Sequence, residues 1–463
     1  ATVNLQDCFG KSRLNAIIMG DAEESMEKLL QGLPPHTISG VIWRNWQPKP
    51  TREQFEHYNE CIDWASIPYH EYWKRTAALY DWNRMDEKEK LDKQYEINTV
   101  RIHSLVACEL ACTFCSVTNS RRFASGSNKP SIVNLSEGAL RRNLLAIKSQ
   151  VPNVMTIYDS SDEVFLGAGR GMQYVQILQQ VKSVMDDGLP RGMRYLIQCR
   201  TNDLYEELII EAAKAGVKHF TIGVEGGNEK LRKSVIKPQK EDHVRNVIQW
   251  CVREGIVPYS LLILFLPEAT IQDLYETVTN TRDYMAMGAT ISVEPFCMSY
   301  IGTNLHESSD YLTEHVTYDI PFTGRPAKKL KWATLIWPRD QAVCAVLQWF
   351  RDHIDSFIEV ARNNSNHRHT FKGFTGKLTI ACLEEALRLF ELGRIPSWDA
   401  ARQGKHSMVY QDYGDQISGV ELSFMVRANK TVSRFNSTHS LLDDVNAGIK
   451  GRIKDPGLSH EGI

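Results

Sequence analysis

Residues 108–115 read CELACTFC, which places Cys108, Cys112 and Cys115 in a C-x3-C-x2-C spacing. Three thiolates this close together can ligate three irons of a [4Fe–4S] cluster. A cubane with three protein ligands keeps its fourth iron open, and an open metal position can bind a substrate or a cofactor directly. The spacing therefore predicts a reactive iron–sulfur centre with these three cysteines as its metal ligands and catalytic residues.

A zinc site is the competing interpretation of these cysteines. Zinc usually takes one close pair of ligands and a second, distant pair. The remaining cysteines are isolated along the chain: Cys8, Cys61, Cys199, Cys251, Cys297, Cys344 and Cys382. A disulfide framework is disfavoured, because a chain of 463 residues with ten cysteines is too long and too poor in cysteine for a stapled scaffold. An iron–sulfur centre is favoured, and a non-catalytic iron–sulfur or zinc protein stays as an alternative.

The composition is that of a globular enzyme, with 42% hydrophobic and 24% charged residues. A net charge of −2 disfavours a nucleic-acid partner held by charge. The sequence has no apolar run long enough to cross a membrane and no N-terminal secretory signal. Scattered single cysteines fit a reducing compartment. We therefore expect a cytoplasmic protein without a membrane or nucleic-acid partner.

From about residue 96, apolar strand-like runs alternate with helical runs. The strand-like runs lie at 99–106, 153–159, 193–200, 219–225, 259–267 and 289–296. The helical runs lie at 135–150, 172–187, 204–216, 240–255 and 270–288. This alternation is typical of parallel βαβ units, and six strands are too few for a closed eight-stranded barrel. The prediction is an α/β fold, a partial (β/α)6 barrel over residues 96–310.

Two flanking regions complete the expected organisation. Residues 1–95 are predicted to hold a short strand–helix–strand segment and then, from about residue 46, an irregular aromatic connector that packs against the barrel. The strand signal fades from about residue 300, so residues 311–463 are predicted to be mainly helical with a polar tail.

The cysteine run follows the first strand of the βα series, where the loops of parallel β/α folds carry active sites. This arrangement resembles the radical SAM superfamily, and Phe114 matches the aromatic residue before the last cysteine of that family's motif. The resemblance implies a cluster that binds S-adenosylmethionine (SAM) at its open iron and cleaves it to a 5′-deoxyadenosyl radical, which abstracts hydrogen from a small-molecule substrate. It also implies a one-electron donor such as flavodoxin or ferredoxin.

The same resemblance implies positions for the other SAM-binding groups, beginning after the second and third strands. The turn after the second strand would hold the SAM amino group through Asp159, Ser160, Ser161 and Asp162. Arg200 would face the SAM carboxylate. An ordinary strand-end turn and a surface ion pair remain the respective alternatives.

Three later strand ends would complete the site. Glu225 would accept hydrogen bonds from the ribose, with Gly226 and Gly227 allowing a close backbone approach. The adenine pocket would include Leu266 and Pro267. The sixth strand carries Glu294, a candidate for contacting the substrate or handling a proton.

Two runs resemble one branch of the superfamily, whose members carry a cobalamin-binding domain: residues 15–33 and 292–307. The cobalamin-ligand motif D-x-H-x-x-G does not occur, and only fourteen residues precede the first of these runs. We therefore expect a relative without a recognisable cobalamin domain.

The leading hypothesis is a radical SAM enzyme that dehydrates, dehydrogenates, epimerises or rearranges a polar small molecule in specialised biosynthesis. The alternative is a cobalamin-dependent C-methyltransferase whose cobalamin domain is absent from this sequence.

Overall fold

The structure is a computed structural model. It describes residues 16–18, 23–38, 41–43, 62–106, 108, 110, 112–117, 133–166, 169–300, 303–308, 310–319, 329–364, 371–395, 397–398 and 409–410. Within these residues, no helix combines the length and the apolar character that crossing a membrane requires.

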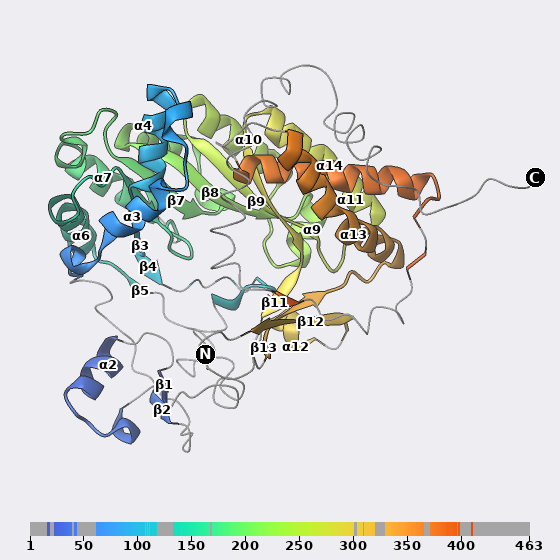
Figure 1. The fold of residues 1–463 in the computed structure, drawn as a ribbon, viewed down its shortest axis with the longest axis horizontal. Helices are drawn as coiled ribbons and strands as arrows, with labels where there is room; N and C mark the ends of the chain where they lie inside the picture. The colour runs from blue at the N-terminus through green and yellow to red at the C-terminus, as the bar shows by residue number, and fades with distance from the viewer. Residues whose placement is uncertain are drawn as a thin grey trace, which may run out of the picture.

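A six-stranded parallel sheet forms the centre of the fold (Figure 1). Its strands are β3 (Thr99–Ile102), β6 (Thr156–Asp159), β7 (Arg194–Cys199), β8 (Val217–Glu225), β9 (Val257–Phe265) and β10 (Thr290–Phe296). They lie in the order β10-β9-β8-β7-β6-β3, and every neighbouring pair is parallel. All six strands predicted from the sequence are present, and the partial (β/α)6 barrel is confirmed.

The helices between the strands also follow the prediction. They are α6 (Glu137–Gln150), α7 (Arg170–Asp186), α8 (Glu206–Ala215), α10 (Glu241–Arg253) and α11 (Ile271–Ala286), with a short additional helix α9 (Glu229–Ser234). Local residues determine where these helices begin and end. Ser136 caps α6 by accepting from the Ala139 N–H, and Gly216 ends α8 at φ 101°, a left-handed conformation that glycine adopts without strain.

The run before the cysteines is not the single strand predicted over residues 99–106. β3 ends at Ile102, and β4 (Leu105–Val106) pairs antiparallel with β5 (Val133–Asn134) outside the main sheet. Two side chains at the end of β6 accept hydrogen bonds from the backbone of this run. Asp159 accepts from the Ser104 N–H and Ser161 accepts from the Leu105 N–H. These hydrogen bonds turn the chain out of the sheet and towards the cysteines.

The N-terminal segment contains β1 (Ala16–Ile18), α2 (Glu23–Leu30), the 3-10 turn η1 (Pro35–Thr37) and β2 (Val41–Trp43). β1 and β2 pair antiparallel, so the predicted strand–helix–strand order is confirmed.

The connector contains helices, and the prediction of an irregular segment is wrong. It forms η2 (Trp64–Ser66), α3 (Tyr69–Ala77), η3 (Trp82–Arg84) and α4 (Glu87–Ile97). An Asp86–Glu89 capping box starts α4. The connector packs against the sheet edge: the Trp64 indole N–H donates to Asn143 on α6, and the Trp73 indole N–H donates to the Thr99 carbonyl.

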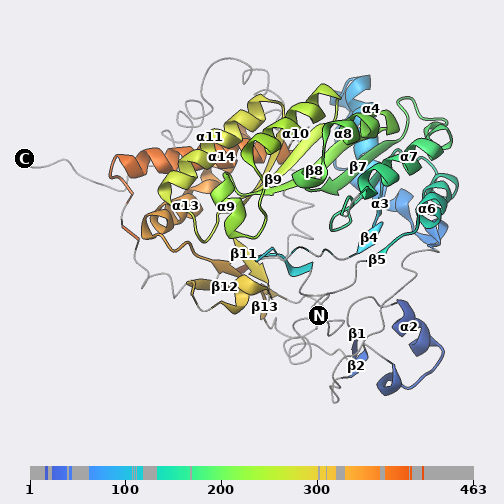
Figure 2. The same cartoon turned by 180° about the vertical axis from the view of Figure 1, so that it is seen from behind.

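The C-terminal region contains strands that the sequence analysis did not predict. β11 (Met298–Tyr300), β12 (Thr313–Asp319), β13 (Lys329–Ile336) and β14 (Val409–Tyr410) form a second sheet in the order β11-β13-β12-β14. Figure 2 shows β11, β12 and β13 below the parallel sheet. The short helix α12 (Asn304–Glu307) follows β11, while the long helices α13 (Gln341–Asn364) and α14 (Phe371–Glu391) confirm the predicted helices. α14 packs tightly on β10, since a Cβ on Gly376 would lie 2.2 Å from the Ile291 carbonyl oxygen.

Candidate active site

Backbone hydrogen bonds hold the cysteine loop on two sides at the carboxyl end of the sheet. On one side, the Thr113 N–H donates to the Val235 carbonyl at 3.3 Å, and the Cys112 sulfur lies 3.9 Å from the Ile236 carbonyl oxygen. On the other side, the Leu305 N–H donates to the Thr113 carbonyl at 3.2 Å. The loop is therefore held between the segment after α9 and the helix α12.

The three thiols lie close enough to influence one another. The pKa of Cys108 is raised to about 12, mainly by burial and in smaller part by the nearby Glu163, Cys112 and Cys115. Burial also raises the pKa of Cys112 and of Cys115. Three soft sulfur donors on one loop fit an iron–sulfur cluster. Among the described residues, no three His, Cys, Asp or Glu side chains converge as a single metal ion would require.

Two of the four residues proposed for the SAM amino group have side chains that are hydrogen-bonded within the fold. Asp159 is buried, and its two oxygens accept from the Ser104 and Ser161 N–H groups, the Ser161 hydroxyl and, at 2.8 Å, the Tyr174 hydroxyl. Ser161 is also buried and supports Leu105. Because their polar side-chain atoms are used within the fold, these two side chains position the start of the cysteine loop, and contact of this turn with SAM stays a prediction.

The other two residues of this turn remain candidates for SAM binding. Ser160 is half-buried, and its hydroxyl lies 3.4 Å from the His103 ring. Asp162 is also half-buried, and its carboxylate lies near enough to Cys115 to add to the rise that burial causes in the pKa of that thiol.

The Arg200 guanidinium lies close to two acidic side chains, those of Asp203 and Glu163, and does not form an isolated surface ion pair. Its guanidinium donates two hydrogen bonds to Asp203, at 2.6 and 2.9 Å, and lies 3.6 Å from Glu163. Burial raises the pKa of Glu163 to about 8 and Asp203 adds to the rise, while Arg200 opposes it. Arg200 is close enough to the thiols to lower the pKa of Cys112 against the effect of burial.

Glu225 ends β8 in an ion pair with Lys237, with Nζ and Oε1 separated by 2.7 Å. Burial lowers the pKa of Lys237, but the Glu225 carboxylate outweighs that effect and holds the pKa above its ordinary value. Glu225 has φ 65° and Ile236, next to Lys237, has φ 57°. Left-handed backbone at residues other than glycine costs about 1–3 kcal/mol each and concentrates at functional sites. The pair is held by strained backbone beside Cys112.

The glycines after Glu225 allow close packing, and their predicted approach to the nucleoside stays a prediction. A Cβ on Gly226 would lie 2.8 Å from the Arg232 backbone nitrogen, and one on Gly227 would lie 2.1 Å from the Thr277 hydroxyl. Neither glycine has a positive φ. Their missing side chains let α9 and α11 approach β8.

The predicted adenine contact at Leu266 and Pro267 stays a prediction, and it would have to be made by the backbone. Leu266 is fully buried in the core beside α13 and α14, and its carbonyl accepts from the Ala269 N–H. The Pro267 carbonyl accepts from the Arg339 N–H at 2.9 Å. The same turn ends in Thr270, whose side chain caps α11. Phe114 packs against this core from the cysteine loop, and its predicted place beside the cofactor stays a prediction.

The inner face of the sheet is polar. On β3, β6 and β8 the side chains of Val100, Ile157 and Phe220 belong to the main core, and the residues that alternate with them lie on the opposite face. The polar side chains on that face are Arg101, Tyr158, His219, Thr221, Tyr259 and Ser292. They contact one another across strands: Arg101 stacks over Tyr158, and the His219 and Tyr259 ring centroids lie 5.1 Å apart.

Glu294 lies on this inner face near the carboxyl end of β10. Its side chain is exposed, yet desolvation by the surrounding protein raises its pKa to about 7. Burial raises the pKa of Tyr300, and the charges of Glu294 and Cys115 add to that rise. Tyr300 therefore lies near both the predicted substrate contact and the cysteine loop.

Two residues of the site were not assigned from the sequence. Lys237 is in the run quoted for the fourth strand, and Glu163 immediately follows Asp162. Because Lys237 precedes Pro238, the sequence indicates that the helix before it ends here. No periodicity in the sequence shows that the Lys237 side chain points into the protein.

Comparison with known proteins identifies a domain in the middle of the chain. Residues 102–280, from the last residue of β3 into α11, match the Radical SAM superfamily. The chain contains a radical SAM domain over these residues. The matched residues include the three cysteines, and enzymes of this family bind a [4Fe–4S] cluster and SAM. No curated protein sequence matches the chain.

Solved structures of radical SAM enzymes share the fold. The methyltransferase TsrM from Kitasatospora setae, with tryptophan and a SAM analogue bound, superposes with a TM-score of 0.52 at 13% identity, over 97% of this chain and 79% of TsrM. The cobalamin-dependent enzyme OxsB, with aqua-cobalamin and SAM bound, superposes with a TM-score of 0.55 at 13% identity, over 97% of this chain and 69% of OxsB.

Proposed function

We propose that the protein cleaves SAM reductively and abstracts hydrogen from a polar small molecule in a specialised biosynthetic pathway of the cytoplasm. The observation that carries this proposal is the cysteine loop fastened at the carboxyl end of the sheet, with Lys237 beside it and a polar sheet face below it. When bound at Cys108, Cys112 and Cys115, the cluster and SAM supply a 5′-deoxyadenosyl radical.

The chain's own charged groups fit the two ends of the methionyl group. Asp162 and Ser160 supply oxygens for the ammonium. Lys237 and Arg200 supply positive charge for the carboxylate. Lys237 contacts only one oxygen of Glu225, and we assign the other oxygen to the ribose hydroxyls.

The substrate class follows from the inner face of the sheet. Arg101, Tyr158, His219 and Ser292 offer a cation, hydroxyls and an imidazole, which suit a substrate with several polar groups. Glu294, with a pKa of about 7, can accept or donate a proton in the same space. Dehydration, dehydrogenation, epimerisation and rearrangement are the reactions that this proposal includes.

The test is anaerobic reconstitution followed by incubation with SAM and a strong chemical reductant. We expect slow formation of 5′-deoxyadenosine and methionine without substrate. Glu225→Ala should weaken SAM binding by about 1.5–3 kcal/mol, because charge-assisted hydrogen bonds are lost. Reconstituted protein that leaves SAM intact would refute the proposal.

A cobalamin-dependent C-methyltransferase is the second candidate, since TsrM and OxsB share the fold and are a methyltransferase and a cobalamin-dependent enzyme, respectively. Anaerobic titration with hydroxocobalamin separates the two candidates. We expect no stoichiometric binding to this chain and no release of S-adenosylhomocysteine. Cobalamin-dependent release of S-adenosylhomocysteine would favour the methyltransferase.

A further inference from the structure

Residues 228–240 lie directly over the cysteine loop. The Val235 carbonyl accepts from the Thr113 N–H, and the Ile236 carbonyl oxygen lies 3.9 Å from the Cys112 sulfur. Ile236 itself is 49% exposed. Cys112 is half-buried, so this thiol lies close to the surface of the protein beside Ile236.

This segment is strongly basic in a chain that is slightly acidic overall. It contains five basic residues and one acidic residue, whereas the whole chain has a net charge of −2. Arg232 is buried in an ion pair with Glu241, and Lys237 turns inward to Glu225. The outward lysines are Lys230, Lys233 and Lys240.

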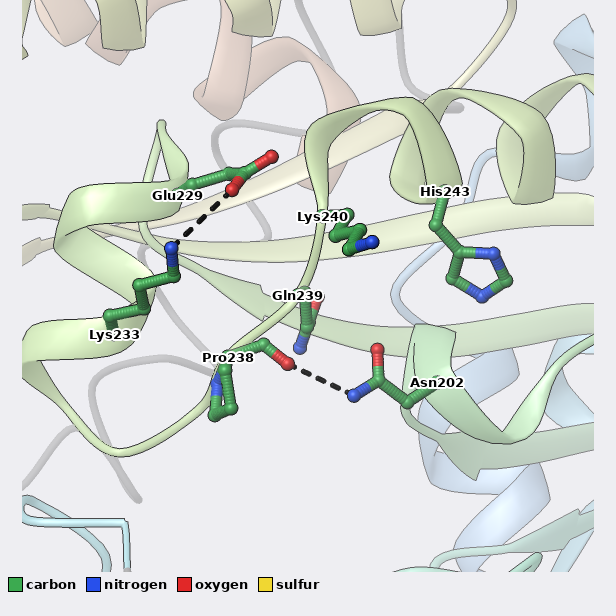
Figure 3. Close-up of a pocket in the computed structure, with 7 residues that line it drawn as sticks. All are labelled: Asn202, Glu229, Lys233, Pro238, Gln239, Lys240 and His243. Carbon is green, nitrogen blue, oxygen red and sulfur yellow. Dashed lines mark hydrogen bonds and ion pairs between the residues drawn. The ribbon is translucent and has the colours of Figure 1, made fainter.

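A hollow of about 600 Å³ adjoins the basic segment (Figure 3). Lys233 and Lys240 line it, together with Asn202, Glu229, Pro238, Gln239 and His243. The Lys233 side chain is 66% exposed and lies 3.7 Å from Glu229, its acidic partner on α9. Lys233 and Lys240 thus line a concave surface and belong to the same segment as the exposed Ile236.

The backbone at Ile236 supports a role for its exposure. A β-branched residue at φ 57° is strained. Because about half of the Ile236 side chain is exposed, the hydrophobic effect offsets little of that strain. Charged rims around an apolar contact are typical of transient protein interfaces, where charge steers association. A small-molecule site would not need an apolar side chain held outward by strain.

We propose that the surface formed by Lys233, Ile236 and Lys240 docks the protein's electron donor, an acidic one-electron carrier protein with a flavin or an iron–sulfur centre. This proposal rests on the proposed function, since it names the partner of that site. The carrier loses one electron and the cluster gains it, without any bond being made or broken. Charge complementarity between the lysines and an acidic carrier selects this partner over a second copy of the slightly acidic chain.

The test uses the full chain with its cluster reconstituted and Lys233→Glu/Lys240→Glu as the variant. Flavodoxin is the probe carrier. Binding of oxidised flavodoxin is measured directly, and formation of 5′-deoxyadenosine is measured with flavodoxin and its reductase or with dithionite. We expect flavodoxin binding to weaken at least tenfold and its salt dependence to flatten. Iron content and the dithionite-driven rate should stay unchanged.

The control is Lys88→Glu/Lys218→Glu, which reverses the charge of two exposed lysines, one at the start of α4 and one at the start of β8, and should leave flavodoxin binding unchanged. The docking proposal is overturned if the two double variants behave alike, or if oxidised flavodoxin does not bind the unsubstituted protein. Failure of the unsubstituted protein to cleave SAM with dithionite would count against the proposed function alone, because flavodoxin binding does not depend on that reaction.

Discussion

The Lys237 ammonium lies 2.7 Å from the Glu225 carboxylate, and both side chains are 12% exposed. Glu225 ends β8, whereas Lys237 follows α9, so the ion pair ties the segment over the cysteine loop to the end of the central sheet. Gly223 also belongs to this contact, since a Cβ there would lie 2.3 Å from the Lys237 nitrogen. The positive charge is thereby placed beside Cys112.

Breaking this pair from one side should destabilise the fold more than removing it from both sides. An unpaired buried charge costs about 3–5 kcal/mol, whereas replacing both partners with neutral groups costs less. We expect Lys237→Met and Glu225→Gln each to lower the free energy of unfolding by about 3 kcal/mol, and the double variant to lose less than the sum. Denaturant unfolding of the four proteins measures the coupling. Additive losses would contradict a buried ion pair.

The cluster prediction concerns the three cysteines together. We expect protein reconstituted anaerobically to hold about four irons and four sulfides, and Cys108→Ala/Cys112→Ala/Cys115→Ala to hold none. Iron and sulfide analysis with absorption spectroscopy provides the measurement. The matched controls are Cys344→Ala and Cys382→Ala, since both thiols are buried in the core of α13 and α14. A full cluster in the triple variant would remove the assignment.

The sequence predicted the barrel because its signal is long-range and regular. Six apolar runs alternate with amphipathic helices, and local residues such as Ser136, Gly216 and Thr270 mark the helix ends. The strands β12 and β13 were missed because each mixes charged and apolar residues in a run of seven or eight, a pattern that is also typical of surface loops.

The individual site residues were harder to predict, because a turn's sequence does not show which way each side chain points. Asp159 and Asp162 lie three residues apart in one turn, yet Asp159 is enclosed by hydrogen bonds within the fold and Asp162 is half-buried near Cys115. The sequence did not show that the Lys237 side chain points inward, because that direction depends on the left-handed backbone at Ile236.

The network around Asp159 should affect stability and leave SAM binding unchanged. Tyr174→Phe and Ser161→Ala each remove a hydrogen-bond partner from the buried Asp159 carboxylate, which should lower the free energy of unfolding by about 1–3 kcal/mol. Thermal unfolding and the SAM dissociation constant are measured on the same preparations. The control is Ser149→Ala on the exposed face of α6, which should be nearly neutral. A variant of normal stability that binds SAM weakly would restore the direct role for this turn.

The last prediction concerns Glu294, whose pKa desolvation raises to about 7 from the ordinary value of 4.5. The folded state therefore binds the proton more tightly than the unfolded state does. Between about pH 4.5 and pH 7 the folded state holds more protons, so this group's contribution to stability falls as pH rises and becomes constant above about pH 7.

Glu294→Gln removes this titration. We expect the variant to gain stability relative to the unsubstituted protein as pH rises through that window, with a modest gain because the side chain is exposed to solvent. Calorimetric unfolding of both proteins from pH 4.5 to pH 8 measures the difference. Stability curves that run parallel across this range would show that the surrounding protein does not desolvate the carboxyl group. In that case Glu294 would be ionised at neutral pH and could not serve as a proton donor to the substrate.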